Sequence, residues 1–262
     1  MKRAPAVFFG HGSPITILDR GEYAQALAEF GRHCASARGI VILSAHWETL
    51  RAVRVTHWES APLVYDFSGF PAELYRIRYP APGDPDLAEE AAQHLRAGGI
   101  DTAFDDQRGL DHGAWVPLAL TLPSALVPVV QISLARGAPP QEIFSLGAAL
   151  RPLRDSGVVL AGSGGIVHNL PLALANPLDA PPETWALDFD EWVREQIEFR
   201  RFTTLMAYAS EAPFSERAVP TPEHLAPLFF TLGAAHRDDN VHALFRGMEH
   251  GNISMSSYTF GL

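Results

Sequence analysis

Short apolar runs that alternate with amphipathic stretches are the feature that most constrains the fold of this chain. Four runs are apolar on both faces and predict buried strands, at 6–9, 39–45, 127–133 and 157–163. Helical patterns accompany them at 21–37, 84–97 and 139–154. This alternation predicts a mostly parallel sheet with helices on both faces. We therefore expect one three-layer α/β/α domain that spans residues 1–262.

Three other stretches refine this expectation. The segments 54–58 and 253–260 alternate apolar and polar residues, as edge or half-exposed strands do, so we expect a mixed sheet that is mostly parallel. A helix is expected near 222, with Thr221 as its N-cap and Pro222 in its first turn. The segment 58–84 is rich in proline and aromatic residues. It is interpreted either as a functional cover over a pocket or as a surface loop whose aromatics patch the core.

The charge and composition exclude several classes of partner. A net charge of −10 without a basic block argues against nucleic acid or an anionic membrane as the main partner. No segment is apolar for the ~18 residues that a membrane span needs, and the N-terminus has no apolar region typical of a signal peptide. We therefore expect a cytoplasmic protein with small-molecule ligands. Cys34 is the single cysteine, so any metal must be bound by His, Asp or Glu.

Several histidines lie near the predicted ends of strands, where α/β sheets bind their ligands. His11, His46 and His168 each follow or end a predicted strand, and the carboxyl ends of parallel strands meet at one edge. His112 lies in the loop-like sequence GLDHGAW, and His224 in the first turns of a helix. A lone histidine in a loop is usually hydrogen-bonded and structural, but joint placement favours a site for a divalent ion.

Two other kinds of site are not supported. Neither Ser13 nor Ser163 lies in the G-x-S-x-G turn of a serine nucleophile. The sequence GSGG at 162–165 matches neither a phosphate-binding loop nor a dinucleotide fingerprint. A close approach of the backbone to a site is sufficient to explain these glycines.

Several motifs together carry a family resemblance. They are GHGSP, ILSAHWE, YDFSGFPAELYRIRYPAPGDP, RGLDHGAWVPL, GSGGIVHNL and TPEHLAPL, and they run in order from Phe8 to the C-terminal SYTFGL. The chain resembles the class III extradiol ring-cleaving dioxygenases of the LigB type. The most similar branch is that of bacterial and plant DOPA 4,5-dioxygenases.

The resemblance implies roles for five histidines. His11, His46 and His224 match metal ligands, and His168 matches the active-site base, close enough to the ion to serve as a further ligand. His112 matches a second catalytic histidine that donates or relays protons. The implied cofactor is Fe(II), with Zn(II) able to occupy the site in the isolated protein. The implied substrates are a catechol and O₂, and the product is a ring-opened semialdehyde.

Some alternatives stay open at this point. Glu223 is adjacent to His224 and is the carboxylate that many extradiol sites would use, but neighbouring residues on a helix point about 100° apart, so we expect only His224 to bind. Asp111 and Asn169 either orient the imidazoles or cap loops. The same histidines also fit a zinc hydrolase, or a metal-binding protein-interaction module. The sequence allows a monomer or a homo-oligomer.

Overall fold

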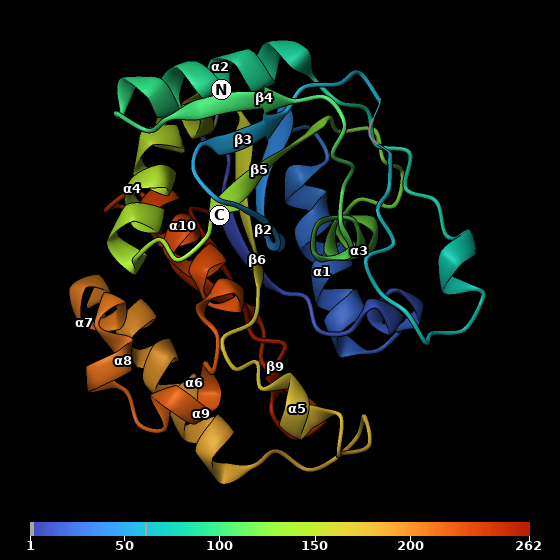
Figure 1. The fold of residues 1–262 in the computed structure, drawn as a ribbon, viewed down its shortest axis with the longest axis vertical. Helices are drawn as coiled ribbons and strands as arrows, with labels where there is room; N and C mark the ends of the chain where they lie inside the picture. Colours follow the sequence, from blue (N-terminus) through green and yellow to red (C-terminus); the bar gives the residue numbers. More distant parts are fainter. Residues whose placement is uncertain (1–2, 61) are drawn as a thin grey trace.

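One mixed β-sheet forms the centre of the molecule. The computed structural model describes residues 3–60 and 62–262, and within them eight strands form this sheet in the order β4-β3-β5-β2-β6-β1-β10-β7 (Figure 1). The strands are β1 (Ala6–Gly10), β2 (Gly39–Thr49), β3 (Val53–Thr56), β4 (Thr102–Asp105), β5 (Val129–Ala135), β6 (Val158–Gly164), β7 (Val241–Phe245) and β10 (Ser257–Phe260). A separate small ladder pairs β8 (Met248–Glu249) with β9 (Ile253–Ser254).

The middle of the sheet is parallel and its flanks are not. Strands β5, β2, β6 and β1 are parallel neighbours, for example with Val41 opposite Leu160 and Val7 opposite Ala161. Strand β3 joins β5 in antiparallel pairing on one side, and β10 joins β1 in the same way on the other. The parallel strands are buried along almost their whole length, because helices cover both faces of the sheet.

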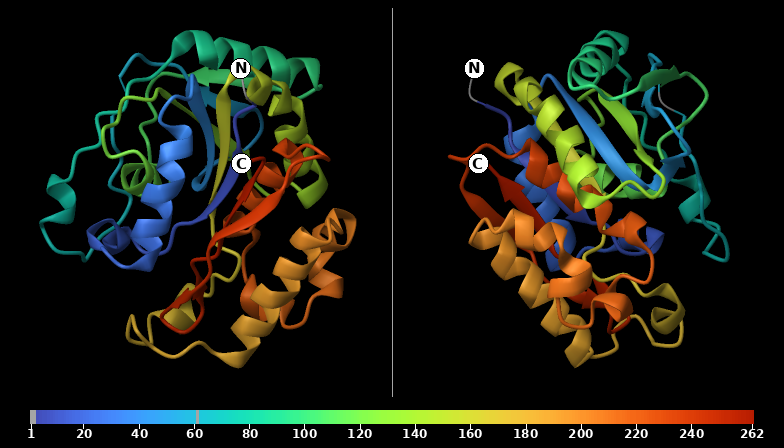
Figure 2. Two further views of the ribbon diagram at one scale, coloured as in Figure 1. Left: turned by 180° about the vertical axis from the view of Figure 1, so that it is seen from behind. Right: turned by 60° about the vertical axis from the view of Figure 1, so that its left-hand side comes forward.

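The helices form the two outer layers. They are α1 (Glu22–Cys34), α2 (Pro85–Ala97), α3 (His112–Thr121), α4 (Pro140–Leu150), α5 (Leu170–Ala173), α6 (Thr184–Glu198), α7 (Phe202–Met206), α8 (Tyr208–Glu211), α9 (Ser215–Ala218) and α10 (Ala226–Ala234). Four 3₁₀ turns are described as well: η1 (Pro14–Leu18), η2 (Leu74–Arg76), η3 (Arg151–Ser156) and η4 (Pro222–His224). Helices α1 and α3 lie on one face of the sheet, and α2, α4 and α10 on the other, while α6 to α9 form a group beyond α10 (Figures 1 and 2).

Each face of the sheet has its own hydrophobic core. One core packs α4 and α10 against the sheet, around residues such as Leu160, Leu146 and Phe230. The other packs α1 and α3 against the opposite face, around Leu27 and Trp115. Side chains that alternate along β1, β2 and β6 reach both cores, which is the physical reason that the first part of each strand is apolar on both faces.

The predicted fold class is confirmed, with corrections in detail. Strands β4 and β7 were not predicted, and the expected strand at 253–260 is divided between β9 and β10. The expected helix at 139–154 ends at Leu150 and continues as the 3₁₀ turn η3. Pro222 does open a turn after Thr221, but this turn is the 3₁₀ helix η4, and the Thr221 hydroxyl does not cap it. That hydroxyl donates to the Glu223 carboxylate instead.

The segment from Trp58 to Asp84 is an ordered excursion with the single 3₁₀ turn η2 among its described residues. Its side chains Tyr65, Phe67 and Phe70 pack against the core that contains α3. The same segment supplies a carboxylate to the histidine cluster described below, so it combines the two interpretations offered by the sequence.

No helix within residues 3–60 and 62–262 is both long enough and apolar enough to cross a membrane.

Candidate metal centre

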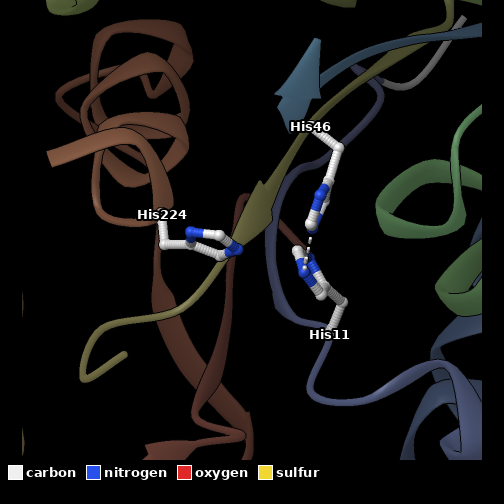
Figure 3. Close-up of side chains that lie close together, drawn as sticks. All are labelled: His11, His46 and His224. Carbon is white, nitrogen blue, oxygen red and sulfur yellow. Dashed lines mark hydrogen bonds between the residues drawn. The ribbon is translucent and has the colours of Figure 1, made fainter. Parts of the chain in front are cut away.

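Three imidazoles from distant parts of the chain meet at the carboxyl edge of the parallel strands. His11 directly follows β1, His46 lies near the end of β2, and His224 ends the turn η4 (Figure 3). One ring nitrogen from each lies within 4.8 Å of the other two. The Nε2 atoms of His11 and His46 face each other at 3.1 Å. The strand pattern placed His11 and His46 at this edge, together with His168, and the family resemblance added His224 as the third residue at the ion.

Glycines let the backbones that carry these histidines come close together. The amide of His11 donates to the Gly164 carbonyl at 3.0 Å, and the amide of Gly165 donates to the His224 carbonyl at 2.8 Å. A Cβ atom on Gly164 would lie 2.0 Å from that same carbonyl oxygen, so no other residue fits there. On the other side, a Cβ atom on Gly113 would lie 2.8 Å from the His46 ring. The GSGG sequence therefore serves close backbone approach, as expected.

The hydrogen bonds of His11 define which of its nitrogens is free. The Ser163 hydroxyl donates its one proton to the Gly113 carbonyl, and it lies 3.0 Å from Nδ1 of His11. Ser163 must therefore accept a proton from Nδ1–H. The Nε2 atom of His11, which faces His46, then carries the lone pair that a metal ion requires.

His224 shows the same arrangement with a carboxylate as its partner. Its Nδ1 lies 3.0 Å from Oε1 of Glu223, which accepts this proton. Its Nε2 is buried and has no hydrogen-bond partner among the described residues. Glu223 thus lies on the Nδ1 side of the ring, away from the free nitrogen. This geometry favours His224 over Glu223 as the residue that faces an ion.

A second carboxylate, Asp66, holds the other side of the cluster. Its Oδ1 accepts from the backbone amide of His112 at 3.0 Å and lies 2.9 Å from Nδ1 of the same residue. Its Oδ2 lies 3.6 Å from Nδ1 of His46. Sequence reasoning missed Asp66, because one of thirty acidic residues in an irregular segment has no diagnostic spacing. The one available signal was its place in the family-like motif YDFSGFP.

The remaining two predicted histidines complete the cluster. The His112 ring centre lies 4.0 Å from that of His46 and 5.5 Å from that of His11. His168 stacks on His224 with a separation of 3.5 Å and an interplanar angle of 5°. All five histidines singled out in the sequence are therefore brought together.

Burial favours the neutral form of His11, His46, His168 and His224. It lowers the pKa of His46 to about 3 and the pKa values of His168 and His224 to about 4, and neighbouring imidazoles add to this effect. Burial and the same neighbours also depress the pKa of His11. A neutral imidazole is the form that binds a metal, so the site has its ligands ready at neutral pH.

The carboxylates beside the imidazoles are ionised. Burial by itself would raise the pKa of Asp66, but the hydrogen bonds from His112 outweigh it and lower this pKa to about 2. The pKa of Glu223 falls to about 2 in the same way, because hydrogen bonds from His224 and Thr221 outweigh its burial. Both carboxylates therefore accept protons in hydrogen bonds and fix the rings beside them.

The donor set fits a divalent ion. The Nε2 atoms of His11 and His46 lie 3.1 Å apart, within hydrogen-bond distance, so at most one of them carries a proton, and a cation between them would take a lone pair from both. Adjacent nitrogen ligands of an octahedral ion with bonds of ~2.1 Å are separated by roughly 3 Å, which matches this distance. The orphaned Nε2 of His224 is the third donor. Three imidazoles on one side of an ion leave its other positions open for substrates.

Asp111 and Asn169 act as caps. Asp111 is the N-cap of α3, where its Oδ1 accepts from the Ala114 amide at 3.1 Å and from the Ser44 hydroxyl at 2.7 Å. Asn169 is the N-cap of α5, where its Oδ1 accepts from the Leu172 amide at 3.3 Å. Of the two interpretations that the sequence left open, capping is the one that these contacts support.

Fold and site together define the class of protein: an α/β enzyme with an open histidine centre at the carboxyl edge of its sheet. The family model described as the catalytic LigB subunit of aromatic ring-opening dioxygenase matches residues 6–261. The chain therefore belongs to the LigB family. Membership confirms the expected activity class, an oxidoreductase of the extradiol dioxygenase type, and together with the histidine cluster it implies a metal cofactor.

Named relatives cover nearly the whole chain. It is 36% identical to a 4,5-DOPA dioxygenase extradiol of Escherichia coli K12 over 99% of this chain and 95% of that protein. It is 34% identical to the protein of the same name from Portulaca grandiflora, over 97% and 94% of the two chains. A crystal structure of an uncharacterized Escherichia coli K12 protein matches with a TM-score of 0.83 and 32% identity, covering 99% of this chain and 100% of that one.

Proposed function

We propose that this protein is a non-haem Fe(II)-dependent extradiol dioxygenase that cleaves a catechol of the DOPA type to a ring-opened semialdehyde. The observation that carries the proposal is the set of three converging Nε2 atoms, of which that of His224 is buried without a partner. The printed names of the relatives support DOPA as the first substrate to test. The whole of residues 1–262 would form one catalytic domain.

In this proposal His11, His46 and His224 hold the ion through Nε2. When bound there, Fe(II) supplies the electron that spin-paired organic molecules do not readily give to O₂, and it accepts the two oxygens of a diol. Zn(II) is expected at the same nitrogens when the protein is isolated without iron. Because the three ligands are uncharged, the site retains a positive charge that favours binding of the catechol as an anion.

Two further histidines would manage protons. His168, stacked beside His224, is assigned as the base that removes a phenolic proton, and its position against a ligand also makes it available as a fourth ligand. His112, on the side of His46, is assigned as the residue that donates or relays a proton as the ring opens. Phe67 lies edge-on to His112 at 5.8 Å and supplies an apolar wall beside it.

The test is to load the metal-free protein with Fe(II) in the absence of air and to offer a panel of catechols that includes DOPA and protocatechuate. We expect O₂ consumption with formation of a yellow product, whose mass and cleavage position are then determined. The His224→Gln variant is the matched control and should consume no O₂ above background. Hydrolysis of an ester or amide by the Zn(II) form, without O₂ uptake by the Fe(II) form, would instead support the alternative of a zinc hydrolase.

The proposed partners are therefore a catechol and O₂. The protein is expected to be cytoplasmic and either a monomer or a homo-oligomer, with no nucleic acid or membrane as a partner. These expectations remain predictions from the composition and charge of the chain.

A further inference from the structure

Asp66 is the acidic residue that joins two imidazoles of the cluster. Its Oδ1 is bound by His112, and its Oδ2 lies beside His46. The Asp66 side chain is 20% exposed and that of His112 is 8% exposed, so protein rather than bulk water determines their hydrogen bonds.

The chain fixes Asp66 through backbone pairing just before it. The Leu110 amide donates to the Pro62 carbonyl at 2.9 Å, and the Val64 amide donates to the Leu110 carbonyl at 2.7 Å. The Trp115 indole donates to the Val64 carbonyl at 3.2 Å. The segment that carries Asp66 is therefore attached to the start of α3, the helix that begins at His112. Asp66 and His112 are held by the same piece of structure.

The hydrogen bonds determine where the proton of His112 resides. The backbone N–H of His112 can only donate, so Oδ1 of Asp66 is an acceptor in that contact. An ionised carboxylate has only acceptor sites, and the same oxygen lies 2.9 Å from the ring Nδ1. Nδ1 must therefore carry a proton, so in the neutral ring Nε2 of His112 carries the lone pair.

We propose that Asp66 is a positioning residue that locks His112 in its Nδ1–H tautomer, so that Nε2 meets a phenolic hydroxyl of the substrate as a hydrogen-bond acceptor. The substrate part of this inference rests on the proposed function. The tautomer part concerns the protein alone. It follows that His112 first receives a proton from the substrate and gives it back later, which makes it a relay rather than a residue that begins as a donor.

The other proton-handling histidine is held in a different way. The His168 ring lies flat against His224 at 3.5 Å, a contact that fixes the plane of the ring but not the nitrogen that carries the proton. Asp66 thus selects the tautomer of His112, whereas the stacking contact selects none for His168. This difference is a property of the chain that spectroscopy can measure without any turnover.

The test uses the Zn(II)-loaded protein labelled with ¹⁵N-histidine, and long-range ¹H–¹⁵N correlation spectra. The His112→Gln variant assigns the His112 signals by their loss. We expect wild-type His112 to show a protonated Nδ1 and an unprotonated Nε2. Asp66→Ala removes the acceptor for Nδ1–H, so the His112 pattern should shift towards a protonated Nε2 or a mixture. The exposed Glu73 lies in the same segment, and Glu73→Ala is the matched control that should leave the pattern unchanged.

Kinetics of the Fe(II) form give the second measurement. Asp66→Ala should lower kcat by ~10–100-fold with KM within about threefold, because loss of an orienting partner affects the catalytic step more than binding. A wild-type His112 that carries its proton on Nε2 overturns the proposal, even if Asp66→Ala fails to fold. An unchanged tautomer in a folded Asp66→Ala variant also overturns it. If no catechol is cleaved but the wild-type tautomer is as expected, the proposed function fails and the role of Asp66 in setting the tautomer stands.

Discussion

Two clusters of buried polar groups lie at opposite ends of the central sheet, and they differ in how completely they are satisfied. At the end where β1 begins, the fully buried Arg154 donates to the carbonyls of Ala4, Ala234 and Phe260 at 2.8, 2.8 and 3.1 Å. It also donates to Asp239 at 2.6 Å. The guanidinium is enclosed by acceptors and has no room for a ligand.

The histidine centre at the other end is polar and buried as well, but it is left open. Nε2 of His224 has no partner within the part of the chain that the structure describes, and the two Nε2 atoms of His11 and His46 face each other. Unsatisfied buried polar atoms cost free energy, so a protein retains them where something else satisfies them. The two clusters therefore differ in one respect: the guanidinium of Arg154 has all its partners within the fold, whereas the histidine centre keeps a buried nitrogen free for a ligand.

The largest expected effect comes from breaking the closed cluster. Arg154→Met leaves the buried Asp239 carboxylate with only the Arg3 guanidinium at 3.5 Å and the His236 amide as partners, and it should lower the free energy of unfolding by about 3–5 kcal/mol in urea titrations. The protein that remains folded should keep its kcat. Arg32→Met, which removes an exposed ion pair with Glu29, is the control and should cost less than about 1 kcal/mol. A loss of kcat without a loss of stability would contradict the distinction between the two clusters.

An intermediate effect is expected from filling the open cluster. A divalent ion at 100 times its Kd should stabilise the folded protein by about 2.7 kcal/mol, which corresponds to a rise in Tm on the order of 5–10 °C. His224→Gln should lose this rise, because it removes the orphaned Nε2 donor. Thermal unfolding with and without Zn(II), with a chelator as the reference, measures both. A rise of equal size in the variant would show that the ion binds elsewhere.

The smallest effect concerns acid stability at the closed cluster. Burial alone would raise the pKa of Asp239, but hydrogen bonds from Arg154 and the His236 amide outweigh it and hold this pKa below its ordinary value of 3.8. The contribution of Asp239 to stability is therefore fully present above that value and is lost as the pH falls through the lower pKa of the folded state. Unfolding of wild type and Asp239→Asn between about pH 5 and pH 2 should show their difference in stability shrinking as the pH falls. A constant difference would refute this expectation.

The sequence predicted the parts of the fold whose side chains repeat with a clear period. The buried parallel strands β1, β2, β5 and β6 and the helices α1 and α2 lie close to their predicted bounds, because burial on one or both faces leaves a pattern. The side chains of strand β7 are exposed or half-buried, and the strand lies at the edge of the sheet, so its sequence shows little hydrophobic periodicity. Strand β4 is a short edge strand as well. Both were found only in the structure.

The candidate site also contains residues that the sequence could place and residues that it could not. His11 and His46 could be placed because each is attached to a predicted strand whose carboxyl end has a known position. Asp66 could not, because its position depends on pairing between Pro62, Val64 and Leu110, which no local pattern reveals. His224 needed the family motif, since no predicted strand carries it and its turn η4 meets the end of β6 through a close contact of two backbones at Gly164.

The contact between Gly164 and the His224 carbonyl restricts which substitutions the site tolerates. Gly164 bears no functional group, yet a single methyl there would press on the carbonyl of His224 and push that ring out of line with the other two. A complete mutational scan should therefore rank position 164 with the histidines for loss of activity. Libraries designed to change which aromatic compounds the enzyme accepts should keep this glycine constant and vary the residues around Phe67 instead.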